Sequence, residues 1–333
     1  MRWKDNKLVW LGLNIEPRID WTDPVVKHGL EHRVKYCRLL FRFLNGKRRW
    51  YVQLINEGVA YQKPKNYVND GLVGIDLNVS AVAVVANNHA ELAPFCLKVS
   101  GQQTEITALQ HKMERSKRRH NPDNYEPDFQ AKRGRKLVIN KGKNIKSRRL
   151  SWKFTKAYKR NRTQLADLHR KQAAHRKSEQ RKLVNDVLRH GNEIRMENVS
   201  LKGWQKNWGK AIKCKAPGFF QSELIRKAEI ANGSAIKFPT RTTKLSQTCI
   251  CGKQQKKPLS QRVHSCDCGI KMHRDLMSGF LSRHVKSSGE LSLLSAQDGY
   301  IGLESTLKTA WQRYEQIMTE QVASGESTCT DYP

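Results

Sequence analysis

The chain has 333 residues, which is enough for about two domains of ordinary size, and 38% of the residues are hydrophobic, which is enough for one core. Lys and Arg number 62 against 30 Asp and Glu, so the formal net charge of +32 requires a polyanionic partner, and we expect nucleic acid. No segment approaches about 18 uninterrupted apolar residues and the N-terminus shows no signal-peptide pattern, which excludes a membrane protein and predicts a cytoplasmic one.

The N-terminal part of the chain is rich in β-prone residues. An apolar run from Arg38 to Leu44 is followed by Asn45-Gly46 and then by the run from Trp50 to Ile55. Asn-Gly between two such runs fits the type I′ turn, whose twist matches that of the flanking strands. We therefore predict a β-hairpin within residues 33–55, and a polar linker from Gln62 to Asp70 follows it.

Strands alternate with helices from Leu72 onwards, which indicates an α/β layer architecture. The β-prone runs Leu72–Leu77 and Ala81–Ala86 predict a hairpin. Further strands are predicted at Glu193–Glu197 and Ala235–Phe238, each after a helix, and Gly191 is expected to end the first helix. The apolar stripes of the two helices are Leu183, Val184, Val187 and Leu188, and Phe220, Leu224, Ile225 and Ala228.

A strongly basic run lies between these strands. The segment from Lys112 to Arg160 holds 18 Lys and Arg against four acids, Glu114, Asp123, Glu126 and Asp128. A solvated charged face is the ordinary explanation of a charge run. Here aromatic residues that can pack on bases or sugars are interleaved with the cations, so we expect a nucleic-acid-binding segment of helices and loops. These aromatic residues are Tyr125, Phe129, Trp152, Phe154 and Tyr158.

The C-terminal tail reverses the charge balance. From Glu290 onwards it has seven acidic residues, and its basic residues are Lys308 and Arg313. Its apolar residues recur at helical spacing, so we expect a helix that packs on the body of the protein, with a partner helix as the alternative. The stripe consists of Leu303, Leu307, Trp311, Tyr314 and Met318.

Three acidic residues end or begin predicted elements in a fixed order. They are Asp76 in Gly74-Ile75-Asp76-Leu77, Glu197 in Met196-Glu197-Asn198, and Asp275 in His273-Arg274-Asp275-Leu276. Two divalent ions about 4 Å apart can activate water, neutralise a scissile phosphate and stabilise the leaving oxygen. Mg²⁺ prefers carboxylate oxygens for this purpose, so the set predicts a magnesium-dependent nuclease.

Each acid has a separate expected role. Asp76 is expected to bridge both ions, because it lies near a strand end beside Gly74, which we expect to leave space for the substrate. Glu197 would hold one ion and Asp275 would complete the set. Taken singly, Asp76 and Glu197 are also compatible with exposed strand-end acids, and Asp275 with an ordinary first-turn acid of a helix.

Two close cysteine pairs indicate a structural zinc site. Cys249 and Cys251 are followed by Gly252, and Cys266 and Cys268 are followed by a second glycine, Gly269. The glycines allow the backbone to turn towards the metal. Each pair is C-x-C instead of the commoner C-x₂-C, so His264 or His273 is an alternative ligand, and reduced, partly buried thiols are the alternative to zinc. The remaining cysteines, Cys37, Cys96, Cys214 and Cys329, are expected to be incidental.

These motifs together resemble the RuvC-type nuclease half of TnpB. The resemblance rests on the three acidic motifs and on Thr243-Lys244-Leu245-Ser246-Gln247-Thr248-Cys249, which leads into the paired cysteines, and it covers about residues 33–285. TnpB proteins are encoded by bacterial insertion sequences, are often labelled transposases, and resemble ancestors of the type V CRISPR effectors. The family usually begins with a strand and a helical recognition module, whereas this sequence matches from the β-rich module onwards.

The resemblance implies an α/β nuclease domain of RNase H-like (RuvC) fold with an inserted zinc ribbon, preceded by a small β-rich module. It implies cleavage of target DNA with a guide RNA as partner, two catalytic Mg²⁺ ions and one structural Zn²⁺. By motif match, Asp76, Glu197 and Asp275 correspond to the catalytic acids that bind magnesium. The four paired cysteines, Cys249, Cys251, Cys266 and Cys268, correspond to the zinc ligands.

The expected domains follow the motifs. They are a nucleic-acid-binding, wedge-like module at 1–70, a nuclease core at 71–248 with a basic helical insertion at about 105–190, a zinc ribbon at 249–269, a final nuclease segment at 270–289, and a partly helical tail at 290–333. Two other functions are compatible with the same motifs. One is a truncated protein that binds nucleic acid and regulates its transposon without cleavage. The other is a strand-transferring transposase, for which no nucleophilic Tyr or Ser context stands out.

Overall fold

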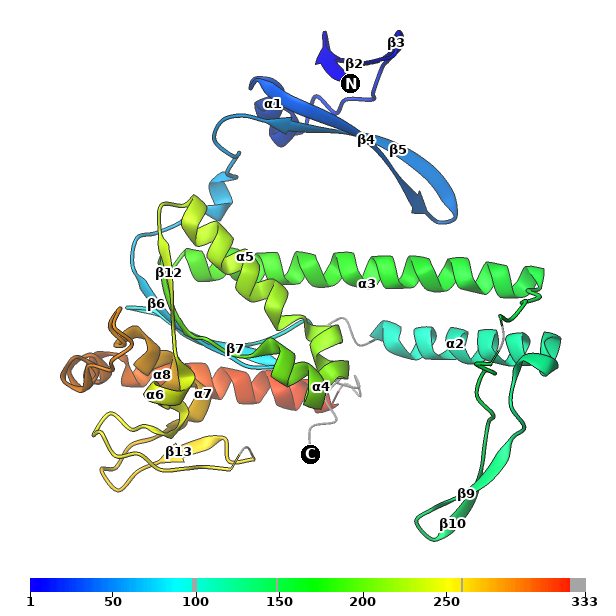
Figure 1. The fold of residues 1–333 in the computed structure, drawn as a ribbon. Helices are drawn as coiled ribbons and strands as arrows, with labels where there is room; N and C mark the ends of the chain where they lie inside the picture. The colour runs from blue at the N-terminus through cyan, green and yellow to red at the C-terminus, as the bar shows by residue number, and fades with distance from the viewer. Residues whose placement is uncertain (98–100, 148, 259, 324–333) are drawn as a thin grey trace. The chain divides into compact units, whose positions relative to one another are not determined.

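The computed structural model describes residues 1–97, 101–147, 149–258 and 260–323. The chain divides into two compact units. The first comprises Met1–Tyr61 and Gln102–Lys171, and the second comprises Gln62–Gly101 and Gln172–Pro333. Figure 1 shows the helices and strands of both units, coloured along the chain. Cys329, one of the cysteines expected to be incidental, lies outside the described residues.

The first unit contains small antiparallel sheets and helices. Its elements are β1 (Arg2–Lys4), β2 (Lys7–Trp10), β3 (Leu13–Ile15), α1 (Pro24–Leu30), β4 (Val34–Leu44), β5 (Lys47–Asn56), α2 (Gly101–His120), η3 (Pro122–Asn124), β9 (Phe129–Arg133), β10 (Lys136–Asn140) and the first half of α3 (Lys156–Leu188). The predicted hairpin is confirmed as β4 paired with β5. Both turn residues, Asn45 and Gly46, have positive φ angles of 51° and 75°, as a type I′ turn requires.

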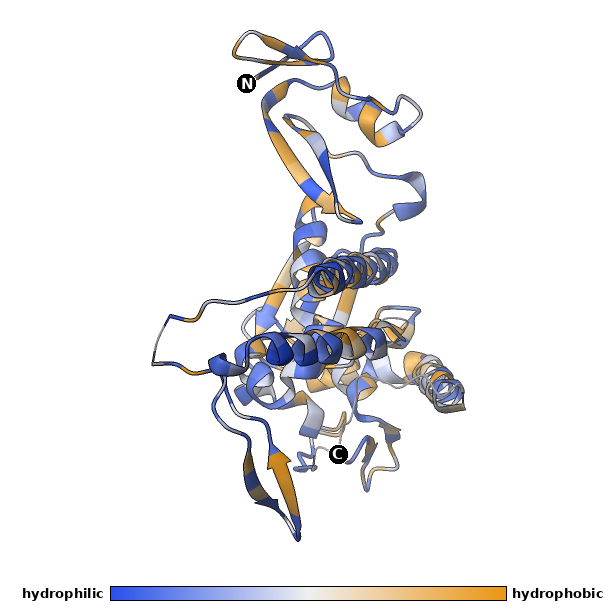
Figure 2. Ribbon diagram, turned by 90° about the vertical axis from the view of Figure 1, so that its right-hand side faces the viewer, coloured by the Kyte–Doolittle hydropathy of each residue, from blue (hydrophilic) through white to orange (hydrophobic). Residues whose placement is uncertain are grey.

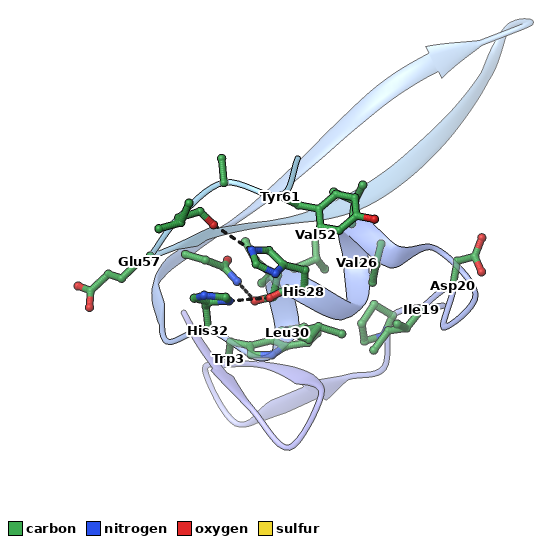
Figure 3. Close-up of a pocket in the computed structure, with 18 of the residues that line it drawn as sticks. Trp3, Ile19, Asp20, Val26, His28, Leu30, His32, Val52, Glu57 and Tyr61 are labelled. Carbon is green, nitrogen blue, oxygen red and sulfur yellow. Dashed lines mark hydrogen bonds between the residues drawn. The ribbon is translucent and has the colours of Figure 1, made fainter. Parts of the chain in front are cut away.

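A cavity of about 620 Å³ lies in the first unit between the N-terminal segment, α1 and β5 (Figure 3). Two histidines that line it are engaged by backbone carbonyls: His28 Nε2 lies 2.9 Å from the Val59 oxygen, and His32 Nδ1 lies 2.7 Å from the His28 oxygen. The His32 ring also packs where a Cβ of Gly58 would be. These contacts hold the end of the module together, and none of the candidate acids or cysteines lines the cavity.

The basic run forms a helix, a hairpin and a second helix. Helices α2 and α3 pack through Ile106, Leu109 and Leu168, which are buried. Strands β9 and β10 form a two-stranded sheet between them. The sequence predicts helices and loops for this segment, so the hairpin is a correction. Its strands are short and almost wholly exposed, so they lack the alternation of apolar and polar residues that identifies a half-buried strand.

The second unit is a mixed α/β body around one five-stranded sheet. Its elements are η1 (Pro64–Asn66), β6 (Leu72–Leu77), β7 (Ala81–Val85), β8 (Ala90–Pro94), the second half of α3, β11 (Glu193–Glu197), α4 (Leu201–Lys215), α5 (Pro217–Ile230), β12 (Ser234–Phe238), α6 (Thr240–Thr243), η4 (Leu245–Gln247), β13 (Val263–Ser265), β14 (Lys271–His273), α7 (Arg274–Arg283) and α8 (Leu293–Ala323). The strand order is β12-β11-β6-β7-β8, with β6, β7 and β8 antiparallel and β11 parallel to both β6 and β12.

Hydrophobic side chains on both faces of the sheet form two cores. One face packs against the second half of α3 and α5, through residues that include Ile75, Val184 and Phe220. The other face packs against α7 and α8, through residues that include Phe280 and Leu307. The central strands are therefore apolar on both faces. Their ribbons are mostly in the hydrophobic colour in Figure 2.

Strand β6 and helix α7 approach each other closely at Gly74. A Cβ atom at this position would lie 2.1 Å from the carbonyl oxygen of Gly279 and 2.8 Å from the backbone nitrogen of Arg283. Only glycine therefore fits, because a backbone cannot give way as a flexible side chain can. The expectation that Gly74 leaves room for a substrate is wrong, because the backbone of α7 fills the space beside this residue. The absence of a side chain at Gly74 allows α7 to pack directly against β6.

Replacing Gly74 by Ala is expected to destabilise the protein by about 3 kcal/mol, because the added methyl group overpacks the contact between β6 and α7. Urea unfolding measures the effect. Gly302→Ala is the matched control, since nothing lies within 4 Å of a Cβ at that position of α8, and it is expected to stabilise by up to about 1 kcal/mol through helix propensity. Equal unfolding free energies for the two variants would contradict the close approach.

Candidate metal centres

Asp76 and Glu197 lie side by side at the ends of two neighbouring parallel strands. The last paired residues of β6 and β11 are Ile75 and Met196, so the next residues along are the two acids. Neighbouring strands are about 4.8 Å apart. Side chains alternate between the faces of a sheet, and Ile75 and Met196 both face the core formed with α3 and α5, so both acids face α7.

Asp275 comes to the same face from helix α7. It occupies the first turn, and its backbone N–H donates to Nδ1 of His273, the N-cap residue, over 3.2 Å. Its carboxylate is buried and accepts from Arg274 Nε at 3.4 Å. An acid in the first turn of a helix is favoured by the helix dipole, and the helix brings Asp275 to the face on which the strand-end acids lie.

The environment of Asp76 reflects its neighbours. The pKa of the Asp76 carboxyl lies well above its usual range, first because the group is desolvated and then because of the negative charges of Asp275 and Glu197. Two groups act in the opposite direction: Asn78, whose Nδ2 donates to Asp76 Oδ2 at 3.0 Å, and the positive charge of Arg274. The three acids therefore interact electrostatically, as the sequence cannot show.

Glu197 is held by a segment that lies almost fifty residues further along the chain. Burial raises the pKa of its carboxyl to about 7, although the backbone N–H of Leu245 and the hydroxyl of Thr243 both donate to it and act in the opposite direction. Lys244 between these donors has a positive φ of 46°, which turns the backbone so that both reach the acid. The sequence motif Thr243-Lys244-Leu245 thus supports Glu197, a role that sequence reasoning missed.

The three acids share a face, but they form a looser group than the cysteines. Among the described residues, the group of potential metal ligands that lie close together is Cys249, Cys251, Cys266 and Cys268, whose ligand atoms are all within 4.8 Å of one another, and the three acids are not part of such a group. The structure thus brings Asp76, Glu197 and Asp275 to one end of the sheet.

The raised pKa of Glu197 gives a pH-dependent prediction. An unfolded chain ionises this carboxyl near its ordinary value of 4.5, so between pH 4.5 and pH 7 the native state binds more protons and becomes less stable as the pH rises. The difference corresponds to about 3 kcal/mol. Without added Mg²⁺, Glu197→Gln is therefore expected to be more stable than the wild type by about this amount at pH 8, and equally stable at pH 4.

Urea unfolding at the two pH values checks this prediction. Glu193→Gln is the control, because Glu193 lies exposed at the opposite end of the same strand, and it is expected to change stability little at either pH. Mg²⁺ is expected to stabilise the wild type at pH 8 and to stabilise Glu197→Gln much less. A Glu197→Gln variant that is no more stable than the wild type at pH 8 would contradict the raised pKa of the Glu197 carboxyl.

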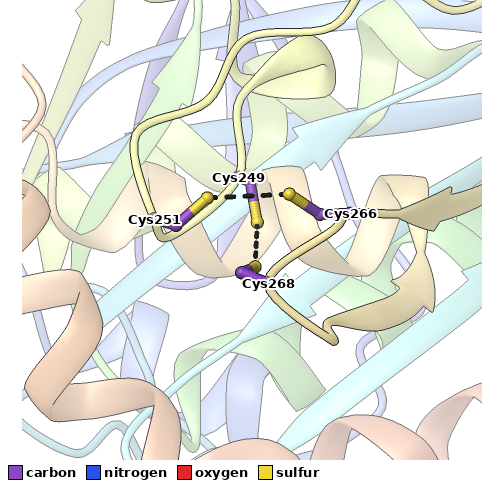
Figure 4. A group of neighbouring side chains, drawn as sticks. All are labelled: Cys249, Cys251, Cys266 and Cys268. Carbon is purple, nitrogen blue, oxygen red and sulfur yellow. Dashed lines mark hydrogen bonds between the residues drawn. The ribbon is translucent and has the colours of Figure 1, made fainter.

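The four paired cysteines converge as the sequence predicts (Figure 4). Their Sγ atoms all lie within 4.8 Å of one another, with 3.6 Å between Cys249 and Cys268 and 3.6 Å between Cys251 and Cys266. A disulfide would bring two sulfurs to about 2.05 Å. A tetrahedral zinc ion with bonds of about 2.3 Å holds its sulfurs about 3.8 Å apart, so the cluster is consistent with a structural zinc site.

The two cysteine pairs form matching turns. The N–H of Gly252 donates to the Cys249 oxygen at 2.9 Å, and the N–H of Gly269 donates to the Cys266 oxygen at 3.0 Å. Both glycines have positive φ angles, of 86° and 90°. The predicted backbone turn after each pair is therefore confirmed, and it allows the short C-x-C spacing to direct both sulfurs inwards.

The histidine alternatives have other partners. His264 lies in β13 and is buried, and its Nδ1 contacts the Lys257 amine. Burial, and then the charge of Lys257, lower the pKa of His264 to about 4. His273 caps α7 as described above and is not in the cysteine group. Four sulfurs thus complete the cluster without either histidine.

The C-terminal helix α8 supports the end of the sheet where the acids lie. Leu303 and Leu307 are buried in the core with α7, which confirms the expected packing on the body. Further along, Trp311 and Tyr314 make edge contacts with the His273 ring, whose centroid lies 6.3 Å and 5.8 Å from theirs. Helix α8 therefore packs around the residue that caps α7 next to Asp275.

Comparison with known proteins adds no relative: no family model matches the chain, and a search of curated proteins found no significant match. No helix in the described part of the chain is long and apolar enough to cross a membrane. The function is therefore inferred from the residues themselves, and the acids on one face of the sheet carry the most information.

Proposed function

We propose that this chain is an RNA-guided DNA endonuclease of the TnpB type, in which Asp76, Glu197 and Asp275 hold two Mg²⁺ ions. The observation that carries the proposal is that three acids, far apart in the sequence, lie on one face at the ends of β6 and β11 and at the start of α7. In open sheets, the carboxyl ends of parallel strands are where ligands bind.

The strand order also supports the proposal. Three antiparallel strands in sequence, followed by two strands added in parallel on the other side of the first, is the arrangement expected of an RNase H-like fold. The cysteine cluster between the second and third acids matches the zinc ribbon of the same family. Each feature is found in other proteins, and their combination in this order is what favours a TnpB-type nuclease.

The donor set fits hard divalent cations. Three carboxylates lie on one face, and the charge of one, Asp76, is disfavoured by its two neighbours and by desolvation. Arg274 supplies a positive charge there, but it is directed to Asp275. Divalent cations would neutralise the remaining excess of negative charge, and carboxylate oxygens are the ligands that Mg²⁺ prefers.

When bound, two Mg²⁺ ions would supply an activated water and neutralise the charge of the phosphodiester. The chain's own residues prepare the site. Asn78 orients the carboxylate of Asp76, and the N–H of Leu245 with the hydroxyl of Thr243 orients that of Glu197. The N-cap of α7 fixes Asp275, so the acids are held on rigid elements before any ion binds.

The test uses the purified protein with the RNA that copurifies with it. Sequencing that RNA gives the guide, and a DNA duplex that matches it is then incubated with the complex with Mg²⁺ or with a chelator. We expect cleavage that requires the matching sequence, the RNA and Mg²⁺. Tight, salt-sensitive binding without any cleavage would instead identify a transposon regulator that does not cut.

A further inference from the structure

The β9–β10 hairpin of the basic run is regularly paired, yet almost all of its residues are exposed to solvent. Five residue pairs, from Phe129↔Asn140 to Arg133↔Lys136, join the strands. A two-residue turn connects them, with Gly134 at a positive φ of 63°. Of the ten strand residues, Ala131 is half-buried and the others are exposed. The strands are therefore paired with each other and covered by nothing else in the described unit.

The base of this hairpin is firmly tied to α2. The Asp128 carboxylate accepts from the Lys141 amine at 2.6 Å and from the Gly142 N–H at 2.9 Å. The Arg118 guanidinium donates to the Gly142 oxygen at 3.0 Å, and Asn124 Nδ2 donates to the Ser151 oxygen at 2.6 Å. The hairpin is thus attached at its base to α2, and its two strands, labelled in Figure 1, are exposed in their own unit.

The exposed strands carry large apolar side chains, and their exposure to water is energetically unfavourable. Leu137 is 69% exposed, Ile139 is 64% exposed and Phe129 is 52% exposed. Figure 2 shows β10 as one of the most hydrophobic strands. A lone two-stranded hairpin is at best marginally stable in water, and exposed apolar groups of this kind mark a contact surface.

The charge of the hairpin selects the partner. Residues 129–140 contain four cations and no acid, and the cations surround the turn at Lys132, Arg133, Arg135 and Lys136. Such a tip repels a second copy of itself and attracts a polyanion. Cations at the tip can contact the phosphates that flank a groove of a nucleic-acid duplex. The aliphatic side chains further along the strands can contact the base edges inside the groove.

We propose that the β9–β10 hairpin inserts into the major groove of duplex DNA. This groove is about 12 Å wide and admits a two-stranded β-ribbon, whereas the major groove of A-form RNA is too narrow for side chains to read. On one face of the hairpin, cross-strand neighbours put Leu137 beside Lys132 and Ile139 beside Gln130. Aliphatic groups contact thymine methyls, and a Gln amide pairs with adenine.

The cations and the aliphatic residues of the hairpin have separate roles in this proposal. Cations at the tip contact phosphates and determine affinity and its salt dependence, whereas Leu137 and Ile139 contact base edges and do not change that dependence. This inference shares with the proposed function the expectation that the chain binds DNA. It does not require cleavage, so the two can fail separately.

The experiment measures binding of a fluorescent 20-base-pair DNA duplex by anisotropy over a range of NaCl concentrations, without Mg²⁺ and in the Asp76→Asn background, so that no cleavage occurs. Arg133→Gln with Arg135→Gln is expected to weaken binding about tenfold at 150 mM NaCl and to reduce the slope of log K against log salt by about 2. Lys63→Gln with Lys65→Gln removes the same charge from an exposed site outside the hairpin and is expected to leave the slope nearly unchanged.

Groove insertion is separated from simple charge attraction by three further measurements. Leu137→Ser with Ile139→Ser is expected to weaken duplex binding severalfold at an unchanged salt slope. Glucosylated 5-hydroxymethylcytosine in the duplex fills the major groove and is expected to weaken the wild type to the level of the hairpin variants. A 20-base-pair RNA duplex should bind the wild type and the variant with Leu137→Ser and Ile139→Ser alike, because side chains cannot read its narrow major groove.

Equal affinities and slopes for wild type and hairpin variants on duplex DNA would overturn the proposal. Such a result would assign the exposed strands to a protein contact instead. Wild-type binding that is unaffected by the glucosylated duplex would also overturn it, because the hairpin would then not enter the major groove. Circular dichroism is expected to show the same fold for all variants, since the substituted side chains contact no core.

Discussion

Replacing Asp76 by Asn is expected to lower the rate of Mg²⁺-dependent DNA cleavage by about a thousandfold or more, which corresponds to about 4 kcal/mol of transition-state stabilisation. The substitution keeps the shape of the side chain but removes the charge that would bind both ions. Cleavage of a guide-matched duplex under single-turnover conditions measures the effect. The RNA content of the complex should not change, because Asp76 lies at the end of the sheet and not in the basic run.

The stability of the same variant separates a functional acid from a structural one. The charge of Asp76 is opposed by desolvation and by Asp275 and Glu197, so Asp76→Asn is expected to leave the metal-free protein as stable as the wild type or more stable. Glu193→Gln, at the other end of β11, is expected to retain full activity. Unchanged cleavage by Asp76→Asn would refute the proposed nuclease centre.

Replacing Cys249 and Cys268 by Ser is expected to abolish zinc binding and to destabilise the protein by more than about 3 kcal/mol. The two sulfurs lie 3.6 Å apart, and Cys249 is fully buried next to the core that contains α7 and α8. Zinc contributes its binding free energy directly to folding, so its loss is expected to unfold the β13–β14 ribbon. Elemental analysis of the purified chain and urea unfolding measure the two effects.

The same substitution is expected to lower cleavage indirectly. Strand β14 ends at His273, and α7 begins at the next residue, so a disordered ribbon removes the support of Asp275. Cys37→Ala is the control, because Cys37 is a buried thiol of the first unit. It is expected to retain one zinc per chain. A double variant that keeps its zinc would contradict the four-sulfur site, as would a wild type that binds none when zinc is supplied.

Local sequence patterns predicted the features that depend on nearby residues. The Asn45-Gly46 turn and the glycines after the cysteine pairs are examples, because each requires a positive φ that glycine or asparagine adopts readily. The ends of β6 and β11, close to Asp76 and at Glu197, also agree with the pattern. A nearly continuous apolar run identifies β6, which is buried on both faces, and alternating apolar residues identify β11.

Patterns failed where a distant segment decides the outcome. Gly74 was expected to leave space, yet its role depends on Gly279 and Arg283, which are more than 200 residues away. Thr243 and Leu245 stabilise Glu197 only because the chain returns to the same strand end. The β9–β10 hairpin escaped prediction because its exposed strands lack the alternation that burial imposes.

The sequence by itself determined the composition of the site: acids in a fixed order, two cysteine pairs, and an excess of cations that requires a polyanion. These properties belong to residue types and to their order along the chain. Only the tertiary structure decided that the three acids share one face, that four sulfurs converge without a histidine, and that no other part of its own unit covers the cationic, apolar hairpin. Each of these depends on long-range packing, in which strand register and the close approach of α7 at Gly74 place residues that no local pattern relates.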